Sequence, residues 1–305
     1  SSTKLFEFCR MSRHKIKALV ESKLHEDGVM ETGVSGVQIF RVTEALHCTP
    51  AVYEPSVIAI VGGSKEAIVN GRRYVYDSSQ YMCCPISLPV EAGTPAASPE
   101  NPLLGVSISL NTKVMKEIVI QVESTAAGAE KPRGDSLSQS VSLARWDDEF
   151  SEALLRLLQL GDSKTQTEVL GEGRLRELYY AVLMGDAGAS ARLAFGVGNE
   201  IARAIEYLQS RLDETVTIDE IVSYVGMSRA VFHRKFKQAT TMSPIQFVKT
   251  MRLNSAAMKI ATGMNVSEAS MAVGYASASQ FSREFKRLYG KSPKQWSQYQ
   301  ALARG

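Results

Sequence analysis

The sequence predicts two domains of different fold class: an N-terminal α+β domain, in which a small β-barrel is flanked by helices, and a C-terminal all-α bundle with two helix-turn-helix motifs. Three observations lead to this prediction. The chain has 305 residues, a length that suits two domains. Residues 37–110 contain several strand-like segments, and one helix-turn-helix pattern occurs twice between residues 217 and 288. We expect the domains at 1–184 and 199–305, with a linker at 185–198.

The N-terminal region changes from a helical to a strand-like pattern. Residues 14–27 place apolar side chains three and four positions apart, which is typical of an amphipathic helix. From Val37 the chain alternates polar and apolar residues or runs β-branched, with turns at Asn70-Gly71 and Pro85. Several short strands of this kind predict a small barrel or sandwich.

Two leucine-rich helices are predicted after the strands, at about 148–160 and 173–184. Their apolar residues would either pack onto the strands or form a homodimer interface. We favour a homodimer contact through helices 148–184, because the leucines cover more than one helical face.

The first helix-turn-helix copy occupies residues 217–238. Thr217 followed by Glu220 is a capping box, and Gly226 can adopt the left-handed conformation that ends a helix. The helix after the turn has Phe232 and Phe236 four residues apart, with basic residues on its other faces. This is the sequence of a short helix, a tight turn and a basic second helix.

The second copy, at residues 265–288, repeats this arrangement. Gly274 corresponds to the first turn glycine, and Phe281 and Phe285 correspond to the two phenylalanines. Each copy is followed by Ser-Pro, which caps a further helix. We therefore predict additional helices at about 199–212, 244–261 and 293–301.

A helical bundle with scattered surface charge is the alternative to a DNA-binding domain. The duplication with matching phenylalanines and Ser-Pro caps argues against it, and so does the charge. Residues 199–305 contain 15 Lys and Arg and 8 Asp and Glu, a net charge of +7, whereas the whole chain carries +3. Positive charge gathered in the segment with the motifs favours binding to the phosphates of double-stranded DNA.

The C-terminal third resembles the AraC/XylS family of bacterial transcription regulators. The resemblance covers about residues 199–301, and GYASASQFSREFKRLYGKSPKQW at 274–296 closely follows the signature of the family's second motif. Two departures are Ala276, where a larger or polar residue is frequent, and residues 239–242, where a glycine is common before Ser-Pro.

The resemblance implies that both second helices enter successive major grooves of DNA. By position, arginines and their neighbours would read base edges, whereas the lysines and Arg287 would contact phosphates. Arg234 and Arg283 are the strongest candidates for base contacts. The full set of candidate DNA-binding residues is Arg229, Ala230, His233, Arg234, Lys237, Ala278, Ser279, Gln280, Ser282, Arg283, Lys286 and Arg287.

The N-terminal part is similar, more loosely, to the cupin-like sensor domain of some AraC-type regulators. Residues 53–82 and 87–110 carry this similarity. It implies a small-molecule effector held inside the barrel, and some relatives respond to aldehydes or other electrophiles. The AraC/XylS resemblance of the C-terminal third further implies that the C-terminal bundle contacts RNA polymerase, and it favours activation over repression.

Three cysteines are candidate sensor residues. Cys83 and Cys84 are adjacent and should point to opposite faces of a strand, and Cys48 lies beside His47. The alternatives are small buried apolar residues or thiols that react with an electrophile or oxidant. Because His47 is the single histidine of the strand region, we predict no metal and no cofactor.

Two other function classes remain open for comparison. One is a cupin-type enzyme fused to a DNA-binding domain, and the other is an architectural DNA binder without an effector. The single histidine of the strand region counts against the enzyme, so we expect a protein that is not an enzyme. The sequence has no apolar run long enough to span a membrane and no secretory signal, and its four cysteines lack metal-ligand spacing, so we expect a cytoplasmic protein that does not bind a membrane.

Overall fold

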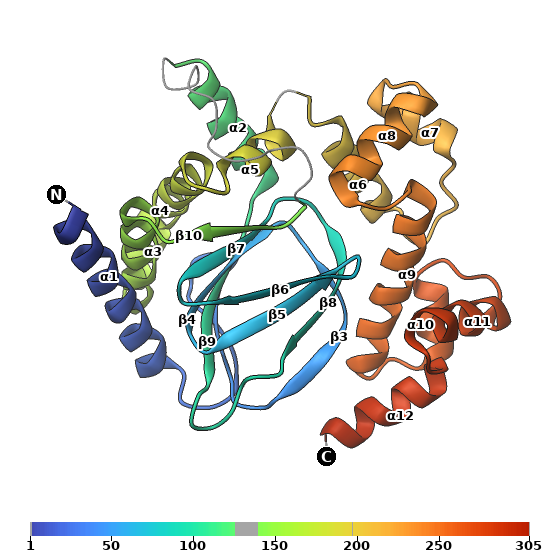
Figure 1. The fold of residues 1–305 in the computed structure, drawn as a ribbon, viewed down its shortest axis with the longest axis horizontal. Helices are drawn as coiled ribbons and strands as arrows, with labels where there is room; N and C mark the ends of the chain where they lie inside the picture. Colours follow the sequence, from blue (N-terminus) through green and yellow to red (C-terminus); the bar gives the residue numbers. More distant parts are fainter. Residues whose placement is uncertain (1, 126–139, 197, 305) are drawn as a thin grey trace.

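The computed structural model describes residues 2–125, 140–196 and 198–304. Figure 1 shows a β-sandwich with helices of the N-terminal half on one side and the C-terminal helices on the other. The strands form two antiparallel sheets. The six-stranded sheet has the order β1 (Gly28–Glu31), β2 (Val37–Val42), β9 (Leu103–Ser109), β4 (Ser56–Gly62), β7 (Gln80–Cys84) and β10 (Ser142–Arg145). The four-stranded sheet has the order β3 (Leu46–Tyr53), β8 (Leu88–Thr94), β5 (Ser64–Val69) and β6 (Arg72–Asp77).

The sequence prediction of a β-barrel is corrected in one respect, because the two sheets do not close into a barrel among the described residues. Alternation of polar and apolar residues specifies which face of each strand is buried, but not whether the outer strands pair with one another. The arrangement is therefore a sandwich, and β3 lies at one edge of its smaller sheet.

Five helices of the described residues belong to the N-terminal half, and three of them pack together beside the larger sheet (Figure 1). Tyr81 of β7 stacks on Phe150 with ring centroids 3.9 Å apart, so this face of β7 points towards the helices. The first helix covers more of the chain than the predicted 14–27, and α2 was not predicted. The bounds are α1 (Ser2–Lys23), α2 (Thr112–Glu123), α3 (Asp148–Gln159), α4 (Lys164–Met184) and α5 (Gly188–Phe195).

The leucines that suggested a homodimer interface are mostly part of the core. Leu154, Leu157 and Leu158 are at most 2% exposed, so α3 packs onto its own domain. On α4, by contrast, Val169 is 73% exposed and Leu170 is 40% exposed. The dimer remains a prediction, and its candidate surface is now the exposed part of α4.

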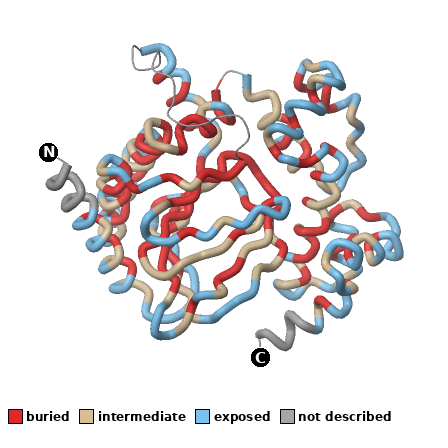
Figure 2. The backbone as a smooth tube through the Cα atoms, in the orientation of Figure 1, coloured by how far each residue is buried: buried red, intermediate tan, exposed pale blue. Residues whose placement is uncertain are grey.

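The predicted linker is largely a packed helix. Within residues 185–198, α5 buries Ala191, Ala194 and Phe195, as the red segment between the two halves in Figure 2 shows. The small side chains of this segment allow it to lie close to its neighbours. Its glycine content alone would instead have suggested a flexible linker.

The C-terminal half forms two small helical units joined by one long helix. Phe232, Phe236 and Phe247 are buried in the first unit, and Phe281 and Phe285 are buried in the second. The long helix α9 matches the predicted residues 244–261. The bounds are α6 (Glu200–Ser210), α7 (Ile218–Val225), α8 (Arg229–Thr240), α9 (Pro244–Ala261), α10 (Val266–Ala272), α11 (Ala278–Tyr289) and α12 (Pro293–Arg304).

Candidate nucleic-acid interface and its contacts with the sensor domain

The first helix-turn-helix unit has the local bonds that its sequence predicts. The backbone N–H of Glu220 donates to the Thr217 hydroxyl at 3.2 Å, and the Thr217 N–H donates to the Glu220 carboxylate at 2.6 Å. Gly226 ends α7 with a φ of 72°, and the Ser228 hydroxyl caps α8. These caps fix the start of both helices and the tight turn between them.

The second unit repeats this geometry. Asn265 caps α10 by accepting from the Glu268 N–H at 2.9 Å, and Ser277 caps α11. Gly274 has a φ of 87°, and a Cβ added there would lie 2.8 Å from the carbonyl oxygen of Asp213. Both the backbone conformation and the close approach therefore require glycine at this turn.

The candidate DNA-reading side chains lie on the outer faces of α8 and α11. The phenylalanines of these helices face the two small cores, so the polar and basic positions point outward, and Figure 2 shows both helices with pale blue, exposed stretches. Arg234, Lys237, Arg283, Lys286 and Arg287 lie outside the cores and are exposed, whereas Ser282 is half-buried. The remaining candidates are exposed as well, namely Arg229, Ala230, His233, Ala278, Ser279 and Gln280.

Two of the outward-facing helices also carry ion pairs within the domain. Arg229 donates to Asp219 at 2.7 Å, which ties the start of α8 to α7. Glu284 of α11 accepts from the Tyr275 hydroxyl at 2.5 Å and lies 3.4 Å from the Lys249 ammonium of α9. A base contact by Arg229 would therefore have to compete with an existing partner.

Helix α9 contacts the sandwich through one buried amide. Asn254 is 3% exposed, and its side-chain N–H groups donate to the carbonyl oxygens of Ala51 at 2.9 Å and Val90 at 3.0 Å. Its oxygen accepts a hydrogen bond from the Tyr289 hydroxyl of α11. The same side chain thus joins β3, β8 and α11, a contact that sequence reasoning missed.

The C-terminal end of α8 is held by the β5–β6 turn. Thr241 caps the C-terminus of α8 with a φ of 64°, which is unusual for a β-branched residue. The Asn70 amide donates to the Thr241 hydroxyl at 3.0 Å and to its carbonyl oxygen at 3.2 Å. The departure at residues 239–242 noted in the sequence is therefore a contact between the two domains.

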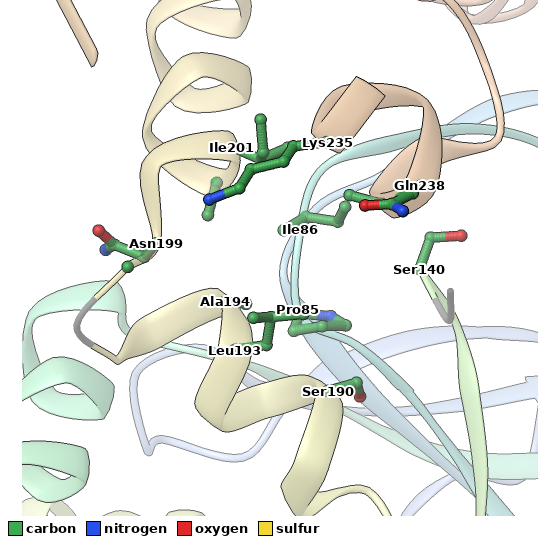
Figure 3. Close-up of a pocket in the computed structure, with 13 residues that line it drawn as sticks. Pro85, Ile86, Ser140, Ser190, Leu193, Ala194, Asn199, Ile201, Lys235 and Gln238 are labelled. Carbon is green, nitrogen blue, oxygen red and sulfur yellow. The ribbon is translucent and has the colours of Figure 1, made fainter. Parts of the chain in front are cut away.

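A cavity of about 190 Å³ lies between the two halves of the chain. Figure 3 shows Leu193 and Ala194 of α5 on one side and Lys235 and Gln238 of α8 on another, with Ile201 of α6 beside them. Its lining is mainly apolar with one lysine amine. A ligand here would touch the N-terminal half and helix α8 together.

The three candidate sensor cysteines lie in surroundings that disfavour the thiolate. Burial raises the pKa of Cys83 to about 12 and also raises the pKa of Cys84. Burial, with the nearby Glu66 carboxylate, raises the pKa of Cys48 as well. Cys83 lies on the same face as Tyr81 and Cys84 on the opposite face, as predicted from their adjacency. The proposed sensor role of these thiols stays a prediction.

Within the described residues, no group of three or more His, Cys, Asp or Glu side chains could hold a metal ion. In the same part of the chain, every helix is too short or too polar to span a bilayer.

Two helix-turn-helix units attached to a β-sandwich form the domain arrangement of a helix-turn-helix transcriptional regulator. Residues 33–190 match the model of the AraC-type transcriptional regulator N-terminus, and residues 221–299 match a helix-turn-helix domain. The chain belongs to the AraC-type family of transcriptional regulators.

Curated relatives are similar over part of their length. The raffinose operon transcriptional regulatory protein RafR of Pediococcus pentosaceus is 27% identical over 46% of this chain and 50% of its own. The regulator ArgR of Pseudomonas aeruginosa is 24% identical over 50% of this chain and 55% of its own. The chain thus spans about half the length of these relatives.

Solved structures of ToxT from Vibrio cholerae share the fold. An apo form of a ToxT variant has a TM-score of 0.53 at 13% identity, over 86% of this chain and 97% of its own. ToxT bound to an unsaturated fatty acid has a TM-score of 0.50 at 12% identity, over 86% of this chain and 94% of its own.

Proposed function

We propose that this protein is a sequence-specific transcription regulator whose DNA binding is controlled by a small-molecule effector. The observation that carries the proposal is the pair of domain contacts on the reading helices. The sandwich bonds the end of α8 through Asn70, and it accepts a hydrogen bond from Asn254 of α9, which in turn accepts one from Tyr289 of α11. An effector that favours one arrangement of the domains would therefore change how the two reading helices are placed relative to each other.

DNA reading is assigned to the exposed faces of α8 and α11. Arg234 and Arg283 are proposed to contact base edges, since an arginine can make two hydrogen bonds to guanine in the major groove. Lys237, Lys286 and Arg287 are proposed to contact phosphates, which position the protein without specifying a sequence.

The cavity between the halves is a proposed effector site. Its apolar lining and the Lys235 amine suit an amphipathic molecule with a carboxylate. ToxT, which shares the fold, is described with an unsaturated fatty acid bound. An aldehyde or other electrophile, which the family resemblance suggests, is the alternative effector class.

Further parts of the proposal concern partners and location. We propose a cytoplasmic protein that acts by binding rather than catalysis and activates transcription through RNA polymerase. Its homodimer would form through α4, where Val169 and Leu170 are exposed.

Selection of genomic DNA fragments by the purified protein at physiological salt tests the proposal. We expect one motif with two half-elements about one helical turn, ~10 base pairs, apart. Recovery of unrelated fragments, with and without cell extract as a source of effector, would refute sequence-specific reading.

A further inference from the structure

A lysine amine without a carboxylate partner lies between the two sheets. The Lys65 Nζ of β5 is 5.6 Å from the ring centroid of Phe40 in the opposite sheet and 5.7 Å from that of Tyr53. Within the described residues, Lys65 has no hydrogen bond or ion pair. The next residue, Glu66, points to the outer face, where it accepts from Arg73 at 2.6 Å. The amine is therefore stabilised by aromatic rings alone.

Two phenols face the same space. Tyr76 pairs directly with Lys65 across β5 and β6 and is 1% exposed, and Tyr53 of β3 is 9% exposed. The two hydroxyls face each other, with Tyr76 as donor to Tyr53, and neither has a further hydrogen-bond partner among the described residues. Burial raises the pKa of both phenols, so both stay protonated donors at neutral pH. This pairing leaves the Tyr53 O–H without an acceptor in the described part of the chain, which is uncommon for a buried donor and points to an acceptor from outside the chain.

Solvent reaches part of this space. Lys65, Tyr74 of β6 and Ser107 of β9 lie on the inner faces of the two sheets by strand register, yet each is half-buried rather than buried. A small molecule could therefore enter between the sheets. The thiol nearby is an inferior nucleophile, because Cys84 donates to the Ile86 carbonyl oxygen at 3.1 Å and burial raises its pKa.

Burial lowers the pKa of the Lys65 ammonium to about 8. At pH 7.5 roughly a quarter of the amine would then be neutral, against about one part in a thousand for a solvated lysine. A neutral amine has the lone pair that attacks a carbonyl carbon, and lysines in apolar surroundings serve as nucleophiles in this way.

We propose that Lys65 is a covalent binding site for a small aldehyde or ketone, which is held as an imine between the two sheets. The amine nitrogen forms a bond to the carbonyl carbon, and the carbonyl oxygen takes up protons and leaves as water. The reaction consumes one amine and one carbonyl group, releases one water and needs no oxidant or reductant. The hydroxyls of Tyr53 and Tyr76 hold the carbonyl oxygen as it becomes a hydroxyl.

The site lies on the two strands that touch the DNA-binding domain. Strand β5 carries Lys65 and leads into Asn70, which bonds to the end of α8. Strand β3 carries Tyr53, and its Ala51 carbonyl oxygen accepts from Asn254 of α9. Control of DNA binding by this site rests on the proposed function, whereas imine formation does not.

Reductive trapping tests the site. The full-length protein without DNA is incubated at pH 7.5 with propanal or benzaldehyde and sodium cyanoborohydride, and the modified lysines are located by peptide mass spectrometry. We expect Lys65 to be modified at least ~10-fold faster than the exposed Lys164, because its larger neutral fraction outweighs its lower basicity. Equal or slower modification of Lys65 would overturn the proposal.

Matched variants separate the alternatives. Lys65→Met and Lys65→Arg should both lose the fast adduct, since arginine keeps the charge but stays protonated, and Lys164→Met should keep it. One contrary result is that propanoate raises the melting temperature of both the unaltered protein and Lys65→Arg while the unaltered protein gives no trapped adduct. That result would contradict the imine and indicate a ligand held by an ion pair. DNA selection by Lys65→Met reports on the proposed function separately: retained sequence reading with a lost adduct supports both proposals.

Discussion

Replacing Asn254 with alanine should separate the sandwich from the second reading helix. The side chain makes three hydrogen bonds from a site that is 3% exposed: two to the carbonyl oxygens of Ala51 and Val90, and one from the Tyr289 hydroxyl. Each bond contributes about 0.5–1.5 kcal/mol net, and a buried hydroxyl left without a partner costs about 1–3 kcal/mol. The two lost carbonyl contacts and the unpartnered hydroxyl together should destabilise the docked arrangement by roughly 2–6 kcal/mol, which is about a 30- to 25,000-fold change in equilibrium constant.

Hydrogen exchange is the direct assay for this change. The Val52 N–H lies on β3 beneath α9, 3.1 Å from the Met258 sulfur, so its protection reports docking. We expect faster exchange at β3 in Asn254→Ala, while the strands of the larger sheet keep their protection. Tryptophan fluorescence is an independent measure of whether each half stays folded, because Trp146 lies in the N-terminal half and Trp296 in the C-terminal half.

Two control variants should change hydrogen exchange at β3 by different amounts from Asn254→Ala. Tyr289→Phe removes one bond and leaves both carbonyl contacts, so its effect should be the smallest. Asn254→Asp keeps the shape and an acceptor for Tyr289, but it places a carboxylate beside two carbonyl oxygens, so its effect should be the largest. If exchange at β3 is the same in all three variants and in the unaltered protein, the amide does not hold the domains together.

Further predictions concern the reading helices and the thiols. Thr241→Gly should raise the free energy of unfolding by about 1 kcal/mol in thermal or denaturant unfolding, because glycine adopts a positive φ without strain; destabilisation would mean that the Asn70 contact outweighs the strain. Arg283→Ala should reduce discrimination between cognate and altered sites by about 1–3 kcal/mol in competition binding, whereas an equal loss on all sequences would contradict a base contact. Lys286→Ala should weaken all sequences alike and lower the slope of log K against log salt by about one, so an unchanged slope would exclude a phosphate contact. If Lys65 is the reactive group, a reporter strain should keep its response to electrophiles when the cysteines are replaced by serine. If a thiol is the reactive group, the response should be lost in one of the variants Cys48→Ser, Cys83→Ser and Cys84→Ser.

The C-terminal fold could be predicted closely because its signals are local. The capping box at Thr217, the turn at Gly226 and the Ser-Pro start of α9 each involve residues three or four positions apart. The packing of Phe232 and Phe236 also follows from helical spacing. Such features are encoded in a few consecutive residues.

The contacts between the domains could not be predicted in this way. Asn254 bonds to carbonyl oxygens that are 203 and 164 residues away in the sequence, and backbone acceptors leave no trace in residue type. The isolation of Lys65 from carboxylates likewise depends on strand register, since Glu66 follows it directly in the sequence but lies on the other face. The choice between barrel and sandwich depends on how the outermost strands are covered, which is a tertiary property.

The position of β3 at the end of its sheet has a consequence for work on the separate domains. In the intact chain α9 covers this strand, and the Val52 N–H meets Met258. A sensor domain cut off before α6 would present this strand uncovered, and an uncovered edge strand is a template for pairing with another chain. Self-association of such a fragment would then reflect the exposed β3 edge, and it should not be taken as the natural dimer contact.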